Sequence, residues 1–251
     1  MSFTGEGPGR PPCKVGAPVT DITAGILAAY GILAAYVHKL KTGEGQVVDT
    51  SLFEAGIVHT YWQSAIALAT GVAPGPMGSA HPLNGPYQAF ETKDGWITIG
   101  AANQRNWERL LDAMEASELA DDPRFKTNTD RMANLKDLEA VLTPVFQGRT
   151  QSDWLARLEA AGVPAGPVLN VCEMFEDPHA QARDMIPTVE HATIGPMRTL
   201  GLPVKLSETP GKVATAAPVF GQHTKDVLGE HGFTADEIAT LADEGAIGVA
   251  E

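Results

Sequence analysis

A long apolar segment with an internal repeat constrains the fold more than any other part of the chain. The hexad Gly-Ile-Leu-Ala-Ala-Tyr occurs twice in succession, over residues 25–30 and 31–36. Because a repeat of six does not match the 3.6-residue turn of a helix, the two copies cover all of its faces with apolar side chains. Such a helix lies in a core or spans a membrane. The uncharged run from Ile22 to Val37 is shorter than the roughly 20 residues that a bilayer requires, so we expect a buried core helix.

Signals at both ends delimit this helix. Pro18 ends the preceding segment, and the side chain of Thr20 or Asp21 can cap the first turn by accepting a backbone N–H. Thr42-Gly43 provides a stop signal after two lysines. The glycines and alanines of the repeat lack bulk, which favours close approach of a neighbouring element.

Asp21 has two interpretations. A carboxylate at a helix start is commonly a cap and nothing more. It is also stabilised in its charged form by the helix dipole, and a carboxylate can attack an activated acyl group to form a covalent acyl-enzyme intermediate. Spacing alone does not decide between a cap and a nucleophile.

A family resemblance favours the nucleophile. The segment Val15-Gly16-x-x-x-x-Asp21-x-x-x-Gly25, followed by residues 31–35 and by Lys41-Thr42-Gly43-Glu44-Gly45-Gln46 through Leu52, resembles the class III CoA-transferase family. This family includes formyl-CoA transferase, carnitine CoA-transferase and the α-methylacyl-CoA racemases. Further matching motifs follow in order in residues 85–99, Asp122-Pro123-Arg124-Phe125 with Arg131 and Asn134, residues 161–168 and residues 217–224. The resemblance implies that Asp21 is the catalytic residue.

The same resemblance implies a fold and a domain organisation. The expected class is α/β, with a partial Rossmann-like large domain and a smaller α+β domain. Residues 1–80 would be a remnant of the large domain that carries the aspartate, residues 81–170 the small domain, and residues 171–251 a segment that returns to the large domain.

The chain departs from the family pattern because Asp21 stands near its beginning. Family members have a Rossmann-like half ahead of this aspartate, which carries most contacts to coenzyme A and, in the racemases, the histidine opposite the aspartate. The CoA-contacting residues of this chain are therefore not identified. We expect apolar surface to be exposed, and a homodimer or a complex with a separate Rossmann-half chain to cover it.

Composition excludes several other classes. The net charge of −13 and the absence of a dense basic run argue against nucleic-acid binding. Anionic coenzyme A would need a local exception, for which Arg10, Lys14, Lys39 and Lys41 are candidates or simply surface charges. The two cysteines and the lack of a signal-peptide pattern indicate a cytoplasmic protein without a membrane partner. The histidines lack metal-ligand spacing, so no metal site is expected.

The remaining segments give local predictions. A strand is expected over residues 46–52 and one helix over residues 53–69, with Asp49 and Glu54 as rival carboxylates of more ordinary roles. Lys93-Asp94-Gly95 predicts a hairpin turn. Further helices are expected over residues 104–116, 131–146, 151–161, 171–176, 179–183, 221–232 and 234–244, and strands over residues 165–170, 188–191 and 197–202.

The Gly/Pro-rich loop of residues 71–86 is the second candidate functional segment. In formyl-CoA transferase the corresponding region is a glycine-rich loop that closes over the active site. Here glycines are fewer and His81 is present, which argues against oxalate or formate as substrate. His81 is either a ligand for a substrate carboxylate or polar surface; Gly78, His81 and Tyr87 are the candidate substrate-binding residues. His223, at a helix start, is a weaker candidate.

The resemblance implies transfer of CoA from an acyl-CoA donor to a small carboxylic acid through a covalent aspartyl intermediate on Asp21. Acyl-CoA is then a substrate, and no tightly bound cofactor is expected. Two alternatives stay open. In an α-methylacyl-CoA racemase, Asp21 would move the α-proton. In a split enzyme, the chain would be a non-catalytic subunit or remnant.

Overall fold

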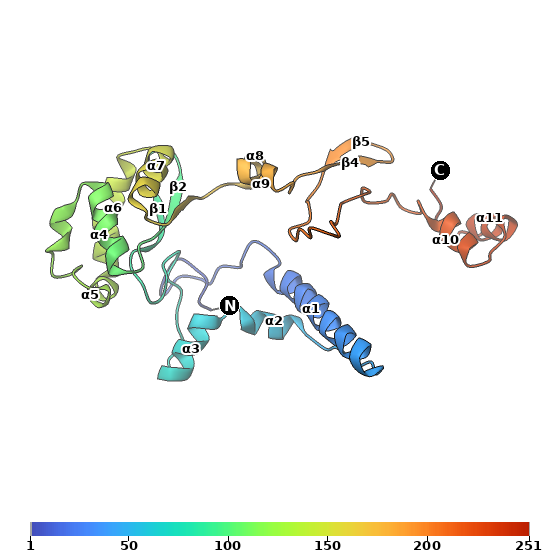
Figure 1. Cartoon of the computed structure of the whole chain (residues 1–251), viewed down its shortest axis with the longest axis horizontal. Helices are drawn as coiled ribbons and strands as arrows, with labels where there is room; N and C mark the ends of the chain where they lie inside the picture. Colours follow the sequence, from blue (N-terminus) through green and yellow to red (C-terminus); the bar gives the residue numbers. More distant parts are fainter. Residues whose placement is uncertain (1, 251) are drawn as a thin grey trace. The chain divides into compact units, whose positions relative to one another are not determined.

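The structure, a computed structural model, describes residues 2–250 and divides into two compact units, Met1–Val168 and Leu169–Glu251. The first unit contains α1 (Val19–Thr42), α2 (Leu52–Val58), α3 (Tyr61–Thr70), β1 (Tyr87–Glu91), β2 (Trp96–Gly100), α4 (Gln104–Met114), the 3-10 helix η1 (Ser117–Ala120), α5 (Asn128–Ala133), α6 (Leu135–Gln147), α7 (Gln151–Ala161) and β3 (Ala165–Pro167) (Figure 1). The second unit contains α8 (Val171–Glu176), α9 (Pro178–Ala182), β4 (Thr188–His191), β5 (Gly195–Arg198), α10 (Thr224–Glu230) and α11 (Ala235–Asp243). This mixture of helices and small sheets confirms the expected α/β class.

The helix α1 forms where the sequence predicts it, but its predicted capping is wrong. It begins at Val19 after Pro18, and no side chain caps its first turn. Asp21 is therefore a residue of the first turn and not the cap. The predicted stop is confirmed, because Gly43 closes the helix in the left-handed conformation with φ of 82° and its N–H donates to the carbonyl of Lys39.

The prediction that α1 is buried is wrong for this chain. None of the 24 described residues of α1 is buried, and the side chains of Ile26 and Tyr30 are 63% and 73% exposed. The physical reason is that α1 packs mainly against α2, which covers one side of a helix that is apolar all round. The expectation of exposed apolar surface is correspondingly confirmed. By length and composition alone, α1 is also suited to cross a membrane, so the absence of a membrane partner stays a prediction.

Small residues of α1 do permit close contact at one position. A Cβ atom built on Gly31 would lie 2.7 Å from Cγ1 of Val48, closer than side chains tolerate. The segment that follows α1 therefore folds back against the helix at a glycine.

The strand predicted over residues 46–52 is wrong. Residues 46–51 form no strand and have no pairing partner, Leu52 already begins α2, and Val47 is 92% exposed. A strand forms only where another strand accepts its hydrogen bonds, and the described residues place none here. The helix expected over residues 53–69 is instead two helices. The N–H and the hydroxyl of Thr60 both donate to the carbonyl of Ile57, and the chain turns at this position between α2 and α3.

A three-stranded antiparallel sheet of order β1-β2-β3 lies in the first unit. The predicted Asp-Gly hairpin joins β1 to β2, with Phe90 opposite Ile97 and Gln88 opposite Ile99. These four residues share one buried face, against which α6 and α7 pack, and α4 packs on α7 and adds its buried side chains to the same core (Figure 1). The opposite face carries the partly exposed side chains of Tyr87 and Trp96.

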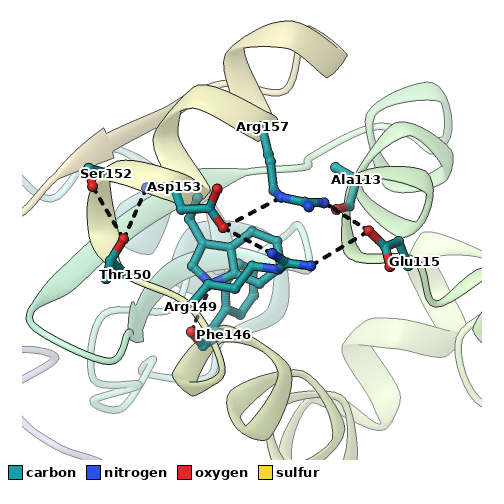
Figure 2. A network of polar contacts seen from close by, with 9 residues as sticks. Ala113, Glu115, Phe146, Arg149, Thr150, Ser152, Asp153 and Arg157 are labelled. Atoms are coloured by element: carbon teal, nitrogen blue, oxygen red, sulfur yellow. Dashed lines mark hydrogen bonds and ion pairs between the residues drawn. The ribbon is translucent and has the colours of Figure 1, made fainter.

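An ion-pair network fastens the end of α4 to α7 (Figure 2). Glu115 closes α4 and accepts contacts from Arg157 at 3.0 Å and Arg149 at 3.6 Å. Asp153 contacts the same two arginines at 3.5 Å and 3.2 Å. Beneath it, the indole N–H of Trp154 donates to the carbonyl of Phe146 at 2.7 Å. The network links two helices that contribute side chains to the same hydrophobic core.

The other boundary predictions differ mainly where a helix is interrupted. The helix expected over residues 131–146 is two helices, α5 and α6, which meet at Asn134. The predicted Thr150 cap and Gly162 stop of α7 are both confirmed. In the second unit, β4 lies where expected, whereas β5 begins two residues earlier than predicted and ends at Arg198.

Candidate functional site

Asp21 stands exposed in the first turn of α1. Its Oδ2 atom accepts a hydrogen bond from the hydroxyl of Thr20 at 3.1 Å. Because the first turn has no side-chain cap, its backbone N–H groups have no side-chain acceptor. The carboxylate therefore lies beside backbone donors at the positive end of a 24-residue helix.

His59 lies near the same end of α1 and was not identified from the sequence. Its Nε2 atom is 2.7 Å from the hydroxyl of Thr23, two residues beyond Asp21. This contact ties the end of α2 to the first turns of α1. A lone histidine in an apolar segment gives no sequence signal for such a contact.

A second cluster forms around His81. The His81 ring stacks on the Tyr87 ring, with centroids 5.0 Å apart and planes 4° from parallel. Trp62 of α3 meets the same imidazole edge-on at 4.7 Å. The structure thus brings together two of the three predicted substrate-binding residues and adds a tryptophan. Trp62 was missed because, in sequence, it is one apolar residue among many.

The hydrogen bonds of His81 define its ring nitrogens. The backbone N–H of Leu83 donates to Nδ1 of His81 at 3.1 Å, which makes Nδ1 the acceptor and leaves Nε2 to carry the proton in the neutral ring. Burial lowers the pKa of His81 from its ordinary value of 6.5. The side chain is therefore a neutral hydrogen-bond donor near neutral pH.

Gly78 lies on a different surface of the same loop. It adopts the left-handed conformation with φ of 63°, and its N–H donates to the carbonyl of Gly5 at 2.9 Å. It lines a pocket of about 620 Å³ together with Ser79, Gln88 and the beginning of α6. His81 and Tyr87 are not among the lining residues of this pocket.

The structure does not join all the predicted residues into one site. Within residues 2–250, no hydrogen bond or ring contact links Asp21 to His81 or Tyr87. The rival carboxylate Glu54 has an ordinary role, since its Oε2 accepts from the hydroxyl of the capping Ser51 at 2.7 Å. His223 precedes α10 in the second unit. No group of three potential metal ligands occurs in the described part of the chain.

Solved structures identify the fold. The chain matches a CAIB/BAIF family protein from Brucella suis with a TM-score of 0.76 and 33% sequence identity, over 92% of this chain and 59% of that one. The mixed α/β architecture is therefore that of the CaiB/BaiF class III CoA-transferase fold.

Comparison of the sequence with known families identifies the family. Residues 1–224 match CoA-transferase family III, and the chain belongs to this family. It is 33% identical to human succinyl-CoA:glutarate CoA-transferase over 230 residues. This alignment covers 92% of this chain and 52% of the human protein. It is 35% identical over 236 residues to succinyl-CoA:mesaconate CoA-transferase of Haloarcula marismortui, over 92% of this chain and 58% of that protein. The chain spans about half the length of these relatives.

Proposed function

We propose that this chain is the aspartate-bearing part of an enzyme that moves CoA from an acyl-CoA donor to a carboxylic acid. The observation that carries the proposal is the exposed carboxylate of Asp21 in the uncapped first turn of α1, in a chain that belongs to CoA-transferase family III. An uncapped helix start offers backbone donors and a positive dipole beside the carboxylate.

The proposed reaction proceeds by acyl transfer through Asp21. Its carboxylate attacks the thioester carbonyl of the donor, the C–S bond breaks, and a mixed anhydride and CoA thiolate form. The thiolate attacks the aspartyl carbonyl of the anhydride, releases the donor acid and leaves an aspartyl-CoA thioester. The carboxylate of the acceptor attacks this thioester, which gives a second mixed anhydride and releases the CoA thiolate. The thiolate then attacks the acceptor's carbonyl carbon in this anhydride and forms the new acyl-CoA. The carboxylate of Asp21 is regenerated.

The start of α1 supports the charge that develops in these steps. Each attack places negative charge on a carbonyl oxygen, which backbone N–H donors stabilise in many acyl-transfer enzymes. The first turn of α1 has such donors without a side-chain acceptor. Loop 71–86 is the other candidate source of donors.

His81 is the proposed contact for the acceptor acid. In the neutral ring the Nε2–H group is a donor, and a carboxylate is an acceptor. Trp62 and Tyr87 add apolar ring surface beside this donor. Since the relatives named above act on succinyl-CoA with glutarate or mesaconate, we propose short dicarboxylic acids as the substrate class.

The test is the intact mass of the purified chain after brief mixing with succinyl-CoA and hydroxylamine. Hydroxylamine converts an aspartyl anhydride or thioester to a stable hydroxamate. We expect a modified species that Asp21→Asn abolishes and that the matched substitution Asp49→Asn leaves in place. An adduct that persists in Asp21→Asn would overturn the role of Asp21.

Racemase chemistry gives a different result in a parallel measurement. With a 2-methylacyl-CoA in deuterated water, a racemase exchanges the α-hydrogen for deuterium without exchange of CoA between acids. Exchange of the α-hydrogen that depends on Asp21, in the absence of a hydroxamate, would replace the transferase proposal.

We further propose that the exposed apolar surface of α1 is covered in the working enzyme, either by a second copy of the chain or by a Rossmann-half chain. Large apolar side chains such as Ile26, Tyr30 and Leu33 are more than half exposed, and contiguous apolar surface of this kind marks interaction sites. If the chain gives no hydroxamate alone but gives an Asp21-dependent one with a Rossmann-half chain, the split-enzyme form is supported.

A further inference from the structure

Side chains of the short helix α5 form hydrogen bonds with the loop that carries His81. Leu83 and Gly85 lie between His81 and Tyr87, and their backbone groups form three hydrogen bonds with two side chains of α5. The residues of α5 belong to the segment that follows the Asp-Pro-Arg-Phe motif, for which the proposed chemistry gives no role. Their contacts indicate one.

Asn128 uses both ends of its amide group on the loop. Its Oδ1 atom accepts from the N–H of Gly85 at 3.1 Å, and its Nδ2 atom donates to the carbonyl of Leu83 at 2.9 Å. A side chain that pairs with a donor and an acceptor two residues apart fixes the conformation of the backbone between them. Asparagine is suited to this, because aspartate lacks the donor and alanine lacks both groups.

Arg131 holds the same loop from one turn further along α5. Its Nε atom donates to the carbonyl of Gly85 at 2.6 Å, and its Nη1 atom donates to the carbonyl of Phe125 at 2.9 Å. The side chain is completely buried, and its guanidinium lies 4.9 Å from the centre of the Trp107 ring. Burial lowers the pKa of Arg131 from its ordinary value. The carbonyl oxygens of Gly85 and Phe125 accept its hydrogen bonds and offset part of the cost of burying the cation.

The loop in turn determines which ring nitrogen of His81 carries the proton. The N–H of Leu83 donates to Nδ1 of His81, and the N–H of His81 donates to the carbonyl of Tyr87 at 2.9 Å. Gly85 lies tightly against the helices, since a Cβ atom there would be 3.3 Å from both Met132 and Leu135. Asn128 thus acts on the imidazole through one residue, Leu83, whose carbonyl it binds and whose N–H selects the ring nitrogen.

We infer that Asn128 and Arg131 are positioning residues, which hold residues 83–85 so that His81 keeps its proton on Nε2 and presents it to the acceptor acid. The positioning itself stands on the hydrogen bonds above. The use of that proton on a carboxylate rests on the proposed function.

The test follows His81 directly by nuclear magnetic resonance of the full chain labelled with ¹⁵N-histidine, together with hydrogen exchange of the Leu83 and Gly85 amides. In the wild type we expect an unprotonated Nδ1 and slow exchange at both amides. In Asn128→Ala we expect at least tenfold faster exchange at both amides and a mixture of His81 tautomers. Asn128→Asp keeps an acceptor for Gly85 but loses the donor to Leu83, so it should show the same change at Leu83.

Two further variants separate positioning from general loss of stability. Thr150→Ala removes the cap of α7 in the same unit without touching the loop, and it should leave the His81 spectrum unchanged. Arg131→Lys removes the Nε donor to the carbonyl of Gly85, which should loosen this residue and so accelerate exchange of its amide, whose acceptor is Asn128. If Asn128→Ala and Asn128→Asp leave His81 and Leu83 like those of Thr150→Ala, the inference is overturned.

Glutarate titration of the same samples tests the functional part. We expect glutarate to shift the His81 signal in the wild type, with at least a tenfold weaker apparent affinity in Asn128→Ala. If glutarate leaves wild-type His81 unchanged while the Asn128 variants alter its tautomer, the positioning holds and the acid-binding role of His81 fails. If glutarate binds both proteins equally, positioning for the acid is refuted.

Discussion

The imidazole of His81 stacks on the phenol ring of Tyr87, with the two planes 4° from parallel. Trp62 closes a second side of the imidazole. This enclosure removes part of the water that would stabilise the imidazolium ion, and burial therefore lowers the pKa of His81. The cluster is a set of aromatic rings packed around a neutral imidazole.

The lowered pKa of His81 predicts a pH-dependent stability. Between the folded pKa and the ordinary value of 6.5, the unfolded chain binds a proton at this residue and the folded chain does not. The free energy of unfolding therefore falls as pH decreases through this window, and the contribution of His81 is constant above and below it. The measurement is urea unfolding at a series of pH values, followed by tryptophan fluorescence.

Comparison with a His81 variant isolates this contribution. His81→Gln should show a flatter dependence than the wild type as the pH falls below 6.5. Equal slopes for the wild type and His81→Gln would contradict the prediction.

Glu115 gives a prediction about backbone strain. It closes α4 in the left-handed conformation, with φ of 58°, which costs a non-glycine residue about 1–2 kcal/mol. Its exposed contacts to Arg149 and Arg157 (Figure 2) contribute only a few tenths of a kcal/mol each. The free energy of unfolding of Glu115→Gly should therefore lie within about 0.5 kcal/mol of the wild-type value. That of Glu115→Val should be lower by about 2 kcal/mol.

Urea unfolding checks this directly, because all four tryptophans lie in the first unit. A loss of more than about 2 kcal/mol in Glu115→Gly would show that the ion-pair network outweighs the strain.

Arg131 gives a prediction about a buried cation. Arg131→Met keeps the length and apolar contacts of the side chain but leaves the carbonyls of Gly85 and Phe125 without their donors. Loss of several buried hydrogen bonds should lower the free energy of unfolding by about 3 kcal/mol. The matched change Arg124→Met removes an exposed arginine that pairs with Asp122, and its unfolding midpoint should stay close to that of the wild type. Similar midpoints for both variants would refute a structural role for Arg131.

Most predictions that depend on local interactions succeeded, although the cap expected from Thr20 or Asp21 does not form. The stop at Gly43, the cap at Thr150 and the turn at Asp94-Gly95 each depend on residues within one turn. The strand predicted over residues 46–52 failed because β structure requires a distant partner, which alternation along one segment does not reveal.

Parts of the candidate site were beyond sequence reasoning for the same reason. His81 and Tyr87 were identified from a loop and a motif, but their stacking with Trp62 depends on how α3 packs. The hydrogen bond from Asn128 to the carbonyl of Leu83 joins residues 45 positions apart in the sequence. Whether Asp21 acts as a nucleophile stays a prediction.

The exposed apolar side of α1 predicts self-association. Ile26, Tyr30, Leu33 and Val37 follow a helical spacing, and each is about half exposed or more. Cover by a second copy would remove this surface from water, so we expect light scattering after size-exclusion chromatography to give a mass above the 26.5 kDa of one chain, rising with concentration. The double substitution Tyr30→Glu with Leu33→Glu should shift the mass towards the monomer, whereas His38→Glu near the end of the same helix should not. A monomeric wild type at all concentrations would exclude a second copy as the cover and leave the Rossmann-half chain as the proposed partner.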